Sequence, residues 1–219
     1  MTTTEQAAVA YANASYLRAA AIAYAKSIGE PIAHFNLKPG QVVDQELPPS
    51  PLRSVLYQKR PTLQDYSTAP MWINVGFAVE IGLKGLYLVT KGTTPPRGHG
   101  TSALLDPLDQ SERDAIEAEL AVVVAELEIS GVLGEGMDRN GLSVQNALDR
   151  FGNDFVDFRY IYEGTQLPDH AENGWMRLRA PSIWFSLDAI LRVLKSKLEF
   201  AGCTGIDDIP FAPLSTSTL

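Results

Sequence analysis

Two oppositely charged residues, Glu80 and Lys84, interrupt the most apolar stretch of the chain, residues 71–89. A glutamate four positions before a lysine is the order that best stabilises a helix. On a partly exposed edge such a pair contributes less than ~1 kcal/mol, whereas a buried glutamate needs a cation from another helix. A structural role is therefore favoured for Glu80 over a catalytic one.

Arg159 is the second residue whose surroundings suggest chemistry, because it lies in the aromatic segment 155–163. An arginine among aromatic side chains is either stacked on a ring or tied to a carboxylate, and Glu80 is the expected partner. An arginine fixed in this way could also face a phosphate. The structural role again comes first, and the phosphate-binding role stays open.

His99 is the histidine most suited to chemistry, since it stands between Gly98 and Gly100. Flanking glycines let the ring and the backbone approach a ligand closely. A histidine in this setting is more often a turn or capping residue than a catalyst. His170 lies in a polar segment and is expected to be solvated.

The composition limits the other functions that the chain can have. Its 219 residues carry a net charge of −8, so an RNA contact would need a local basic patch. The one local concentration of positive charge is expected to be a solvated helix face; it consists of Arg177, Arg179, Arg192, Lys195 and Lys197.

The chain also lacks the residues and motifs of the best-marked enzyme classes. A single cysteine, Cys203, excludes an intrachain disulfide and a cysteine metal cluster, and the histidines are widely spaced. There is no Walker motif, no dinucleotide-binding glycine fingerprint, no HExxH and no GxSxG. We expect no metal and no cofactor. Neither a signal peptide nor a membrane-length apolar run is recognisable, so a cytoplasmic protein without membrane contact is expected.

Two strong helix patterns are expected to position these residues. Residues 5–28 are rich in alanine and end at Gly29. One stripe of this helix contains Val9, Ala12, Tyr16, Ala19, Ala20 and Ala23, which leaves Tyr11, Arg18 and Lys26 for the other faces. Residues 71–89 are apolar on most sides, as in a central helix, and Gly76, Gly82 and Gly85 indicate that other helices approach its backbone closely.

Weaker patterns predict the remaining helices. A short helix is expected over 101–108, and another ends at Gly131, with Ser111 and Asp114 as its capping pair. A third helix covers 146–163 and is interrupted near Gly152. Ser182 is expected to cap the last helix, where Asp188 and Arg192 form an i,i+4 pair. The expected packing faces are Ile116, Leu120, Val123, Val124 and Leu127 on the second of these helices, and Trp184, Leu187, Leu191, Leu194 and Leu198 on the last.

Proline and glycine mark the irregular parts of the chain. Residues 31–61 are a proline-rich irregular arm, in which 52–60 fits a helix or a strand equally well. A glycine-rich loop follows at 131–142, and residues 202–219 form a loose, flexible tail. The fold class is an all-α bundle of about five to six helices, with a single domain over 1–201.

Three motifs in order resemble those of bacterial HEPN-like proteins. They are the F-A-V-E-I-G-L-K-G-L run at 77–86, Gly98-His99 followed by the short leucine-rich segment around Leu104, and the F-V-D-F-R-Y-I-Y-E run at 155–163. The resemblance covers residues 70–165. It implies a helical bundle, commonly a homodimer, from systems of RNA cleavage, toxin–antitoxin pairs or phage defence.

The resemblance also shows where this chain departs from the ribonucleases of that group, which carry an Arg-x(4–6)-His motif at the dimer groove. No arginine here precedes a histidine at that spacing, and Arg159 is followed by Tyr160, Ile161 and Tyr162. The first hypothesis is therefore a non-catalytic module that binds RNA, a nucleotide or a protein partner encoded nearby, with Arg159, Tyr160, Tyr162 and His99 at the ligand.

Two alternatives stay open. The second hypothesis is a metal-independent ribonuclease in which Arg159 stabilises the phosphorane charge and His99 acts as the general base. The third is a structural or interaction protein in which Glu80, Lys84 and Arg159 form an ion-pair network inside the core.

Overall fold

In the computed structural model, the residues described are 1–27, 69–129, 142–149 and 176–206. These residues form helices joined by short turns, and this part of the chain contains no strand. The predicted all-α bundle is confirmed. Its helices are α1 (Thr3–Ser27), α4 (Ala69–Lys91), α5 (Thr101–Leu105), α6 (Gln110–Ile129) and α8 (Met176–Phe200), with a short helical segment at 144–149.

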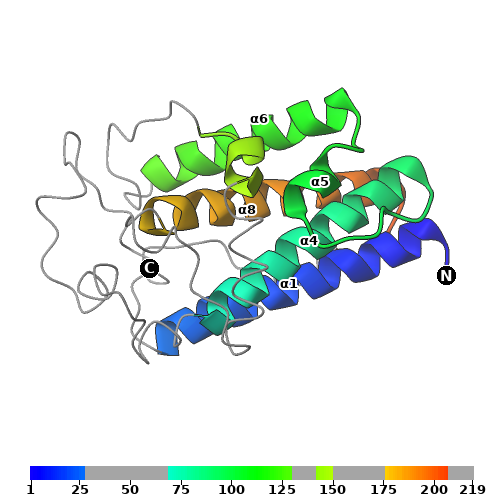
Figure 1. Cartoon of the computed structure of the whole chain (residues 1–219). Helices are drawn as coiled ribbons and strands as arrows, with labels where there is room; N and C mark the ends of the chain where they lie inside the picture. Colours follow the sequence, from blue (N-terminus) through cyan, green and yellow to red (C-terminus); the bar gives the residue numbers. More distant parts are fainter. Residues whose placement is uncertain (28–68, 130–141, 150–175, 207–219) are drawn as a thin grey trace, which may run out of the picture.

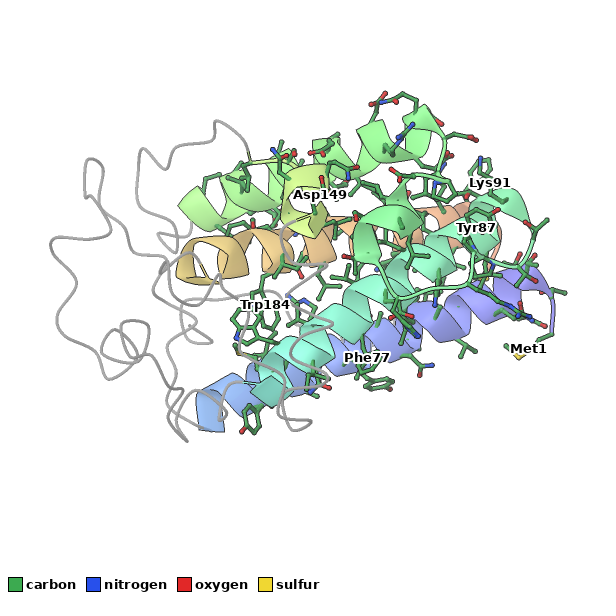
Figure 2. The ribbon with its side chains drawn as sticks, viewed as in Figure 1. Met1, Phe77, Tyr87, Lys91, Asp149 and Trp184 are labelled. Atoms are coloured by element: carbon green, nitrogen blue, oxygen red, sulfur yellow. The ribbon has the colours of Figure 1, made fainter. Side chains whose placement is uncertain are left out.

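The helix α8 lies between α6 on one side and the α1–α4 pair on the other (Figure 1). It runs parallel to α4 and antiparallel to α1 and α6. Figure 2 shows the buried Trp184 side chain pointing from α8 towards α4. All five side chains of the predicted α8 seam are buried, as are the five of α6. The buried faces of α6 and α8 therefore contribute to one core that lies between α1, α4, α6 and α8.

Glycines on α4 allow three helices to converge. A Cβ atom at Gly85 would lie 2.9 Å from Leu194 Cδ2 on α8 and 3.0 Å from Ala10 Cβ on α1. One turn earlier, a Cβ at Gly82 would lie 3.2 Å from Ile190 Cγ2. The prediction of close helix approach is confirmed at both positions, because a larger side chain would push the neighbouring helices apart.

The helix α1 is confirmed, but its apolar stripe faces outward. Val9 and Tyr16 are 48% and 57% exposed, whereas Tyr11 and Arg18 are buried against α4 and α8. Alanine supplies helix propensity on every side of α1, so the buried face is marked only by a few large side chains, among them Tyr11, Arg18 and Ile22. The outward stripe is therefore a surface.

Several helix ends differ from the expected ones. Thr2 Oγ1 accepts the Glu5 N–H at 3.2 Å, while Glu5 Oε2 accepts the Thr2 N–H at 2.7 Å, which is a capping box for α1. The helix α6 begins at Gln110, so the predicted Ser111–Asp114 cap is wrong; Asp114 instead accepts a hydrogen bond from the Gln110 side chain. The helix α8 begins at Met176, so Ser182 lies inside it and is not its cap.

The end of α8 is closed by a glycine. Gly202, with φ of 80°, donates to Glu199 O at 2.9 Å, and Cys203 N donates to Leu198 O at 3.0 Å, the two bonds of a Schellman motif. The chain then turns back, and Ile206 is buried. The described start of the predicted tail therefore packs on the bundle, while 207–219 lie outside the described residues.

One described helix passes a test of length and composition for a membrane span. This segment, Met71–Lys91, has a mean hydropathy of 1.3, although no apolar run of that length was expected. In the structure 56% of it is buried inside the bundle. The core helix of a soluble protein passes the same test, so the finding is weak support for a membrane span.

Candidate functional site

Glu80 is the centre of the candidate site and lies midway along α4. Its side chain is only 6% exposed, although neighbouring turns of the helix are packed by leucines and valines. A carboxylate in such a place needs partners that supply positive charge or hydrogen bonds. Both partners that the structure provides come from the edge of the bundle.

The first partner is Lys84, one turn further along α4. Its Nζ donates to Glu80 Oε1 at 2.6 Å, and its side chain stays 26% exposed. The i,i+4 pair predicted from the sequence is confirmed. Because Lys84 reaches solvent, the pair is half-buried rather than internal.

The second partner is His99, which sequence reasoning did not connect with Glu80. Its Nδ1 lies 3.0 Å from Glu80 Oε1 and 3.1 Å from Oε2. More than half of the ring, 56% of the side chain, remains exposed. With Nδ1 on the carboxylate, the Nε2 edge of the ring is the one left for a ligand.

The loop between α4 and α5 brings His99 back onto Glu80. Gly92, with φ of 63°, ends α4 and turns the chain, and Gly98 has φ of 137°, a conformation that favours glycine. Gly100 is the N-cap residue of α5. The backbone turns at Gly92 and Gly98 place the His99 backbone, and the Glu80 carboxylate holds the ring.

The charges of the three groups set the chemistry of the cluster. Glu80 and Lys84 cancel, so the cluster is neutral with neutral His99 and carries one positive charge when His99 is protonated. A bound anion would be attracted by that positive charge. A carboxylate that holds Nδ1 also stabilises an imidazolium that forms during proton transfer, as an orienting group does for a general base.

A buried ion pair between α1 and α8 was missed. Arg18 donates from Nε to Asp188 Oδ1 at 2.5 Å and from Nη2 to Oδ2 at 2.8 Å, and the two side chains are 2% and 5% exposed. The direct partner of Asp188 is thus Arg18, and the predicted interaction with Arg192 is present only as a longer-range attraction between the two charges. The sequence contained one sign of this pair, because each charged residue lies in an otherwise apolar segment. Arg18 lies within an alanine-rich helix, and Asp188 lies beside the leucine-rich seam.

Arg192 instead crosses to α6. It bonds Glu126 through both terminal nitrogens, at 2.9 and 2.5 Å, and this hydrogen bonding holds the pKa of the Glu126 carboxyl below its usual range. The same contact raises the pKa of Arg192. Lys197 lies 3.5 Å from Glu112, so the part of the basic cluster that is described faces acidic groups rather than solvent alone.

At the far end of α4, Lys91 pairs with Asp109, just before α6 (Figure 2). This contact closes the same turn that carries His99, since the loop and α5 lie between the two residues. It ties the start of α6 to the end of α4. The candidate site thus sits on a loop that is held at both ends.

The remaining predicted site residues lie outside the described part of the chain. Arg159, Tyr160 and Tyr162 belong to 150–175, so the Glu80–Arg159 pair stays a prediction. In the ranges that are described, no group of three or more His, Cys, Asp or Glu side chains is placed to hold a metal ion. Comparisons of the chain with protein-family models, with curated proteins and with solved structures gave no match.

Proposed function

We propose that this chain is a HEPN-like helical module, of a bacterial toxin–antitoxin or defence system, that binds the phosphate of an RNA or a nucleotide at His99. The observation that carries the proposal is the contact of His99 Nδ1 with the buried Glu80 carboxylate, while 56% of the side chain stays exposed. The ring is held on one edge and open on the other. The three motifs that resemble HEPN-like proteins support the same assignment.

The charge around His99 fits a phosphate ligand. Lys84 neutralises Glu80, and Arg97 is exposed in the same loop. A phosphate beside Nε2 would therefore meet the donor of a protonated imidazole without an uncompensated carboxylate. This local patch meets the need for a basic site on a chain whose net charge is −8.

A second candidate function, a metal-independent ribonuclease, is favoured by the Glu80–His99 pair itself. His99 Nε2 would accept the proton of the 2′-hydroxyl as its oxygen attacks the phosphorus. The 5′-oxygen would leave and take up a proton from solvent, and a 2′,3′-cyclic phosphate would remain. Glu80 would stabilise the imidazolium formed in that step, and Arg159 is the residue proposed to stabilise the phosphorane charge.

The test separates the two edges of the His99 ring. In His99→Asn the amide nitrogen stands near Nδ1 and keeps the bond to Glu80, whereas Nε2 is lost. Binding of fluorescently labelled single-stranded RNA and tRNA is measured by anisotropy for the wild type, His99→Asn and Arg159→Ala. Glu126→Gln is the matched control, because Glu126 pairs with Arg192 between α6 and α8.

We expect His99→Asn to weaken RNA binding by about tenfold or more, while its melting temperature stays at the wild-type value. Equal affinity of His99→Asn and the wild type would refute a phosphate site at His99. If Arg159→Ala lowers only the melting temperature, Arg159 is structural.

The same samples test cleavage. Incubation with tRNA and mixed single-stranded RNA, followed by detection of 2′,3′-cyclic ends, should show product with the wild type and none with His99→Asn if the second candidate is correct. Binding without any cleavage refutes the ribonuclease and leaves the binding module.

A further inference from the structure

Tyr87 lies on the same face of α4 as the cluster formed by Glu80, Lys84 and His99. Along this helix Glu80, Lys84, Tyr87 and Lys91 follow one another at spacings of four, three and four, so they form one stripe. Around the helix axis Tyr87 lies only about 20° from Glu80. Lys91, at the end of the stripe, pairs with Asp109. Tyr87 is therefore the aromatic residue between the cluster and this closed end of the helix.

The geometry of a helix directs the Tyr87 side chain towards the cluster. Side chains on an α-helix lean towards its N-terminus, over the residues three and four positions earlier. Lys84 follows this rule, since its Nζ reaches back one turn to Glu80. Tyr87 comes three residues after Lys84, a rise of about 4.5 Å, and by the same rule leans back over it. Phe77 stands three residues before Glu80 and leans away from the cluster; Figure 2 shows the two aromatic residues at separate positions along α4.

The Tyr87 ring is supported by the bundle on one side and open to water on another. Its side chain is half-buried and packs against the core. In the described part of the chain its hydroxyl has no hydrogen-bond partner, and this oxygen is not sealed from water. A ring that is held by packing and still reaches solvent is suited to stacking on a planar group.

The two hydrogen-bond donors of the cluster converge on one atom of Glu80. Lys84 Nζ lies 2.6 Å and His99 Nδ1 lies 3.0 Å from the same oxygen, Oε1. The ammonium group has further protons to donate, and 26% of the Lys84 side chain is exposed. A phosphate at His99 is therefore also close to Lys84, and Tyr87 is the next residue of the stripe. The donors and the ring lie within the reach of a single nucleotide, in which one sugar separates the phosphate from the base.

We propose that Tyr87 stacks on the base of the nucleotide whose phosphate lies at His99 and Lys84, so that the site selects unpaired nucleotides. This stacking role rests on the phosphate site proposed above and narrows its ligand to a single-stranded one. In a duplex the bases are stacked on one another and paired inward, so a ring beside the phosphate has no base face to contact. In a single strand every base offers a face, and stacking on an aromatic side chain tolerates any sequence.

The first test compares ring variants of the full chain on one fluorescently labelled, single-stranded RNA oligonucleotide by anisotropy. Tyr87→Leu should weaken binding by about tenfold, as expected for the loss of one stacked base, whereas Tyr87→Phe keeps the ring and should stay within about twofold of the wild type. Phe77→Leu is the matched control, because it removes a ring from the same helix on the side that leans away from the cluster. This control should bind like the wild type, and thermal melting followed by circular dichroism shows that each variant is folded.

The second test changes the ligand and needs no variant. The same oligonucleotide with its bases removed, and the same sequence in a duplex, should each bind the wild type about tenfold more weakly than the single strand. Tyr87→Leu should bind the single strand and the abasic strand with equal affinity.

Two results would overturn the stacking role. One is equal affinity of the wild type for the single strand and either of the other two ligands. The other is a Tyr87→Leu variant that binds the single strand like the wild type, or that loses affinity equally for the single and the abasic strand. If His99→Asn weakens binding in the same experiment, the stacking role alone is refuted. Wild-type affinity of His99→Asn refutes the phosphate site, and the stacking role with it.

Discussion

The buried pair of Arg18 and Asp188 gives the most quantitative prediction for stability. The change to make is Arg18→Met, which keeps most of the length of the side chain and removes its guanidinium. Asp188 then stays almost wholly buried on α8 without the two hydrogen bonds that Arg18 gives it. An unpaired carboxylate in that position is strongly unfavourable.

The size of the effect follows from the geometry in two ways. Two charge-assisted hydrogen bonds, at 2.5 and 2.8 Å, contribute about 1.5–3 kcal/mol each. Removal of one partner of a buried ion pair typically costs about 3–5 kcal/mol. We therefore expect Arg18→Met to lower the free energy of unfolding by about 3–5 kcal/mol, a large part of the ~5–15 kcal/mol of a whole domain.

The assay is urea unfolding followed by tryptophan fluorescence, for which Trp184, one turn before Asp188 and fully buried, is a suitable reporter. The double variant Arg18→Met/Asp188→Leu should recover most of the loss, because neither charge of the pair is then left without its partner. A loss below ~1 kcal/mol in the single variant, or a double variant no more stable than Arg18→Met, would refute the reasoning.

Three further predictions follow from packing, charge and capping. Gly85→Ala should lower the free energy of unfolding by about 1–3 kcal/mol in urea titrations despite its better helix propensity, since its Cβ would lie 2.9 Å from Leu194 Cδ2; increased stability would contradict the packing. Glu126→Gln should cost less than ~1 kcal/mol at neutral pH. Because Arg192 lowers the pKa of Glu126 in the folded state, that contribution is present above the ordinary glutamate range and lost as the pH falls through the lowered pKa, so urea curves of variant and wild type should converge in acid; a constant difference would exclude this linkage. Thr2→Ala should lower the stability of α1 by about 1 kcal/mol, measured by thermal melting, and no change would mean that the capping box is not formed in solution.

Patterns set by local spacing could be predicted from the sequence. The helix α4 could be predicted because its long apolar run repeats at helical spacing. The Glu80–Lys84 pair could be predicted because the two residues lie four apart on that helix. The leucines of α8 were assigned correctly for the same reason. In each case the chain itself brings the interacting residues together.

Partners from distant segments could not be predicted in this way. Asp188 lies between a local candidate, Arg192, and a distant one, Arg18, and the distant one wins because Asp188 is on the buried face of α8. On α1, alanine on every side hides which face is buried, so the outward stripe was not recognised as a surface. The His99–Glu80 contact depends on the turn of the loop at Gly92 and Gly98, which spacing alone does not fix.

Two of the buried carboxylates, Glu80 and Asp188, should respond differently to the loss of charge. Glu80 differs from Asp188 because its partners Lys84 and His99 are themselves partly exposed and can be hydrated when the carboxylate is removed. Glu80→Gln should therefore lower the free energy of unfolding by only about 1 kcal/mol, as for an ordinary hydrogen bond.

The same variant separates the functions proposed for His99. Without the negative charge of Glu80, RNA binding should be no weaker than in the wild type, whereas any cleavage should be lost because the imidazolium is no longer stabilised. Urea titration measures the change in stability, RNA anisotropy measures binding, and the detection of 2′,3′-cyclic ends measures cleavage. A loss of about 3–5 kcal/mol would contradict this reasoning and indicate instead that Glu80 neutralises a buried cation, the role that we predict for Arg159.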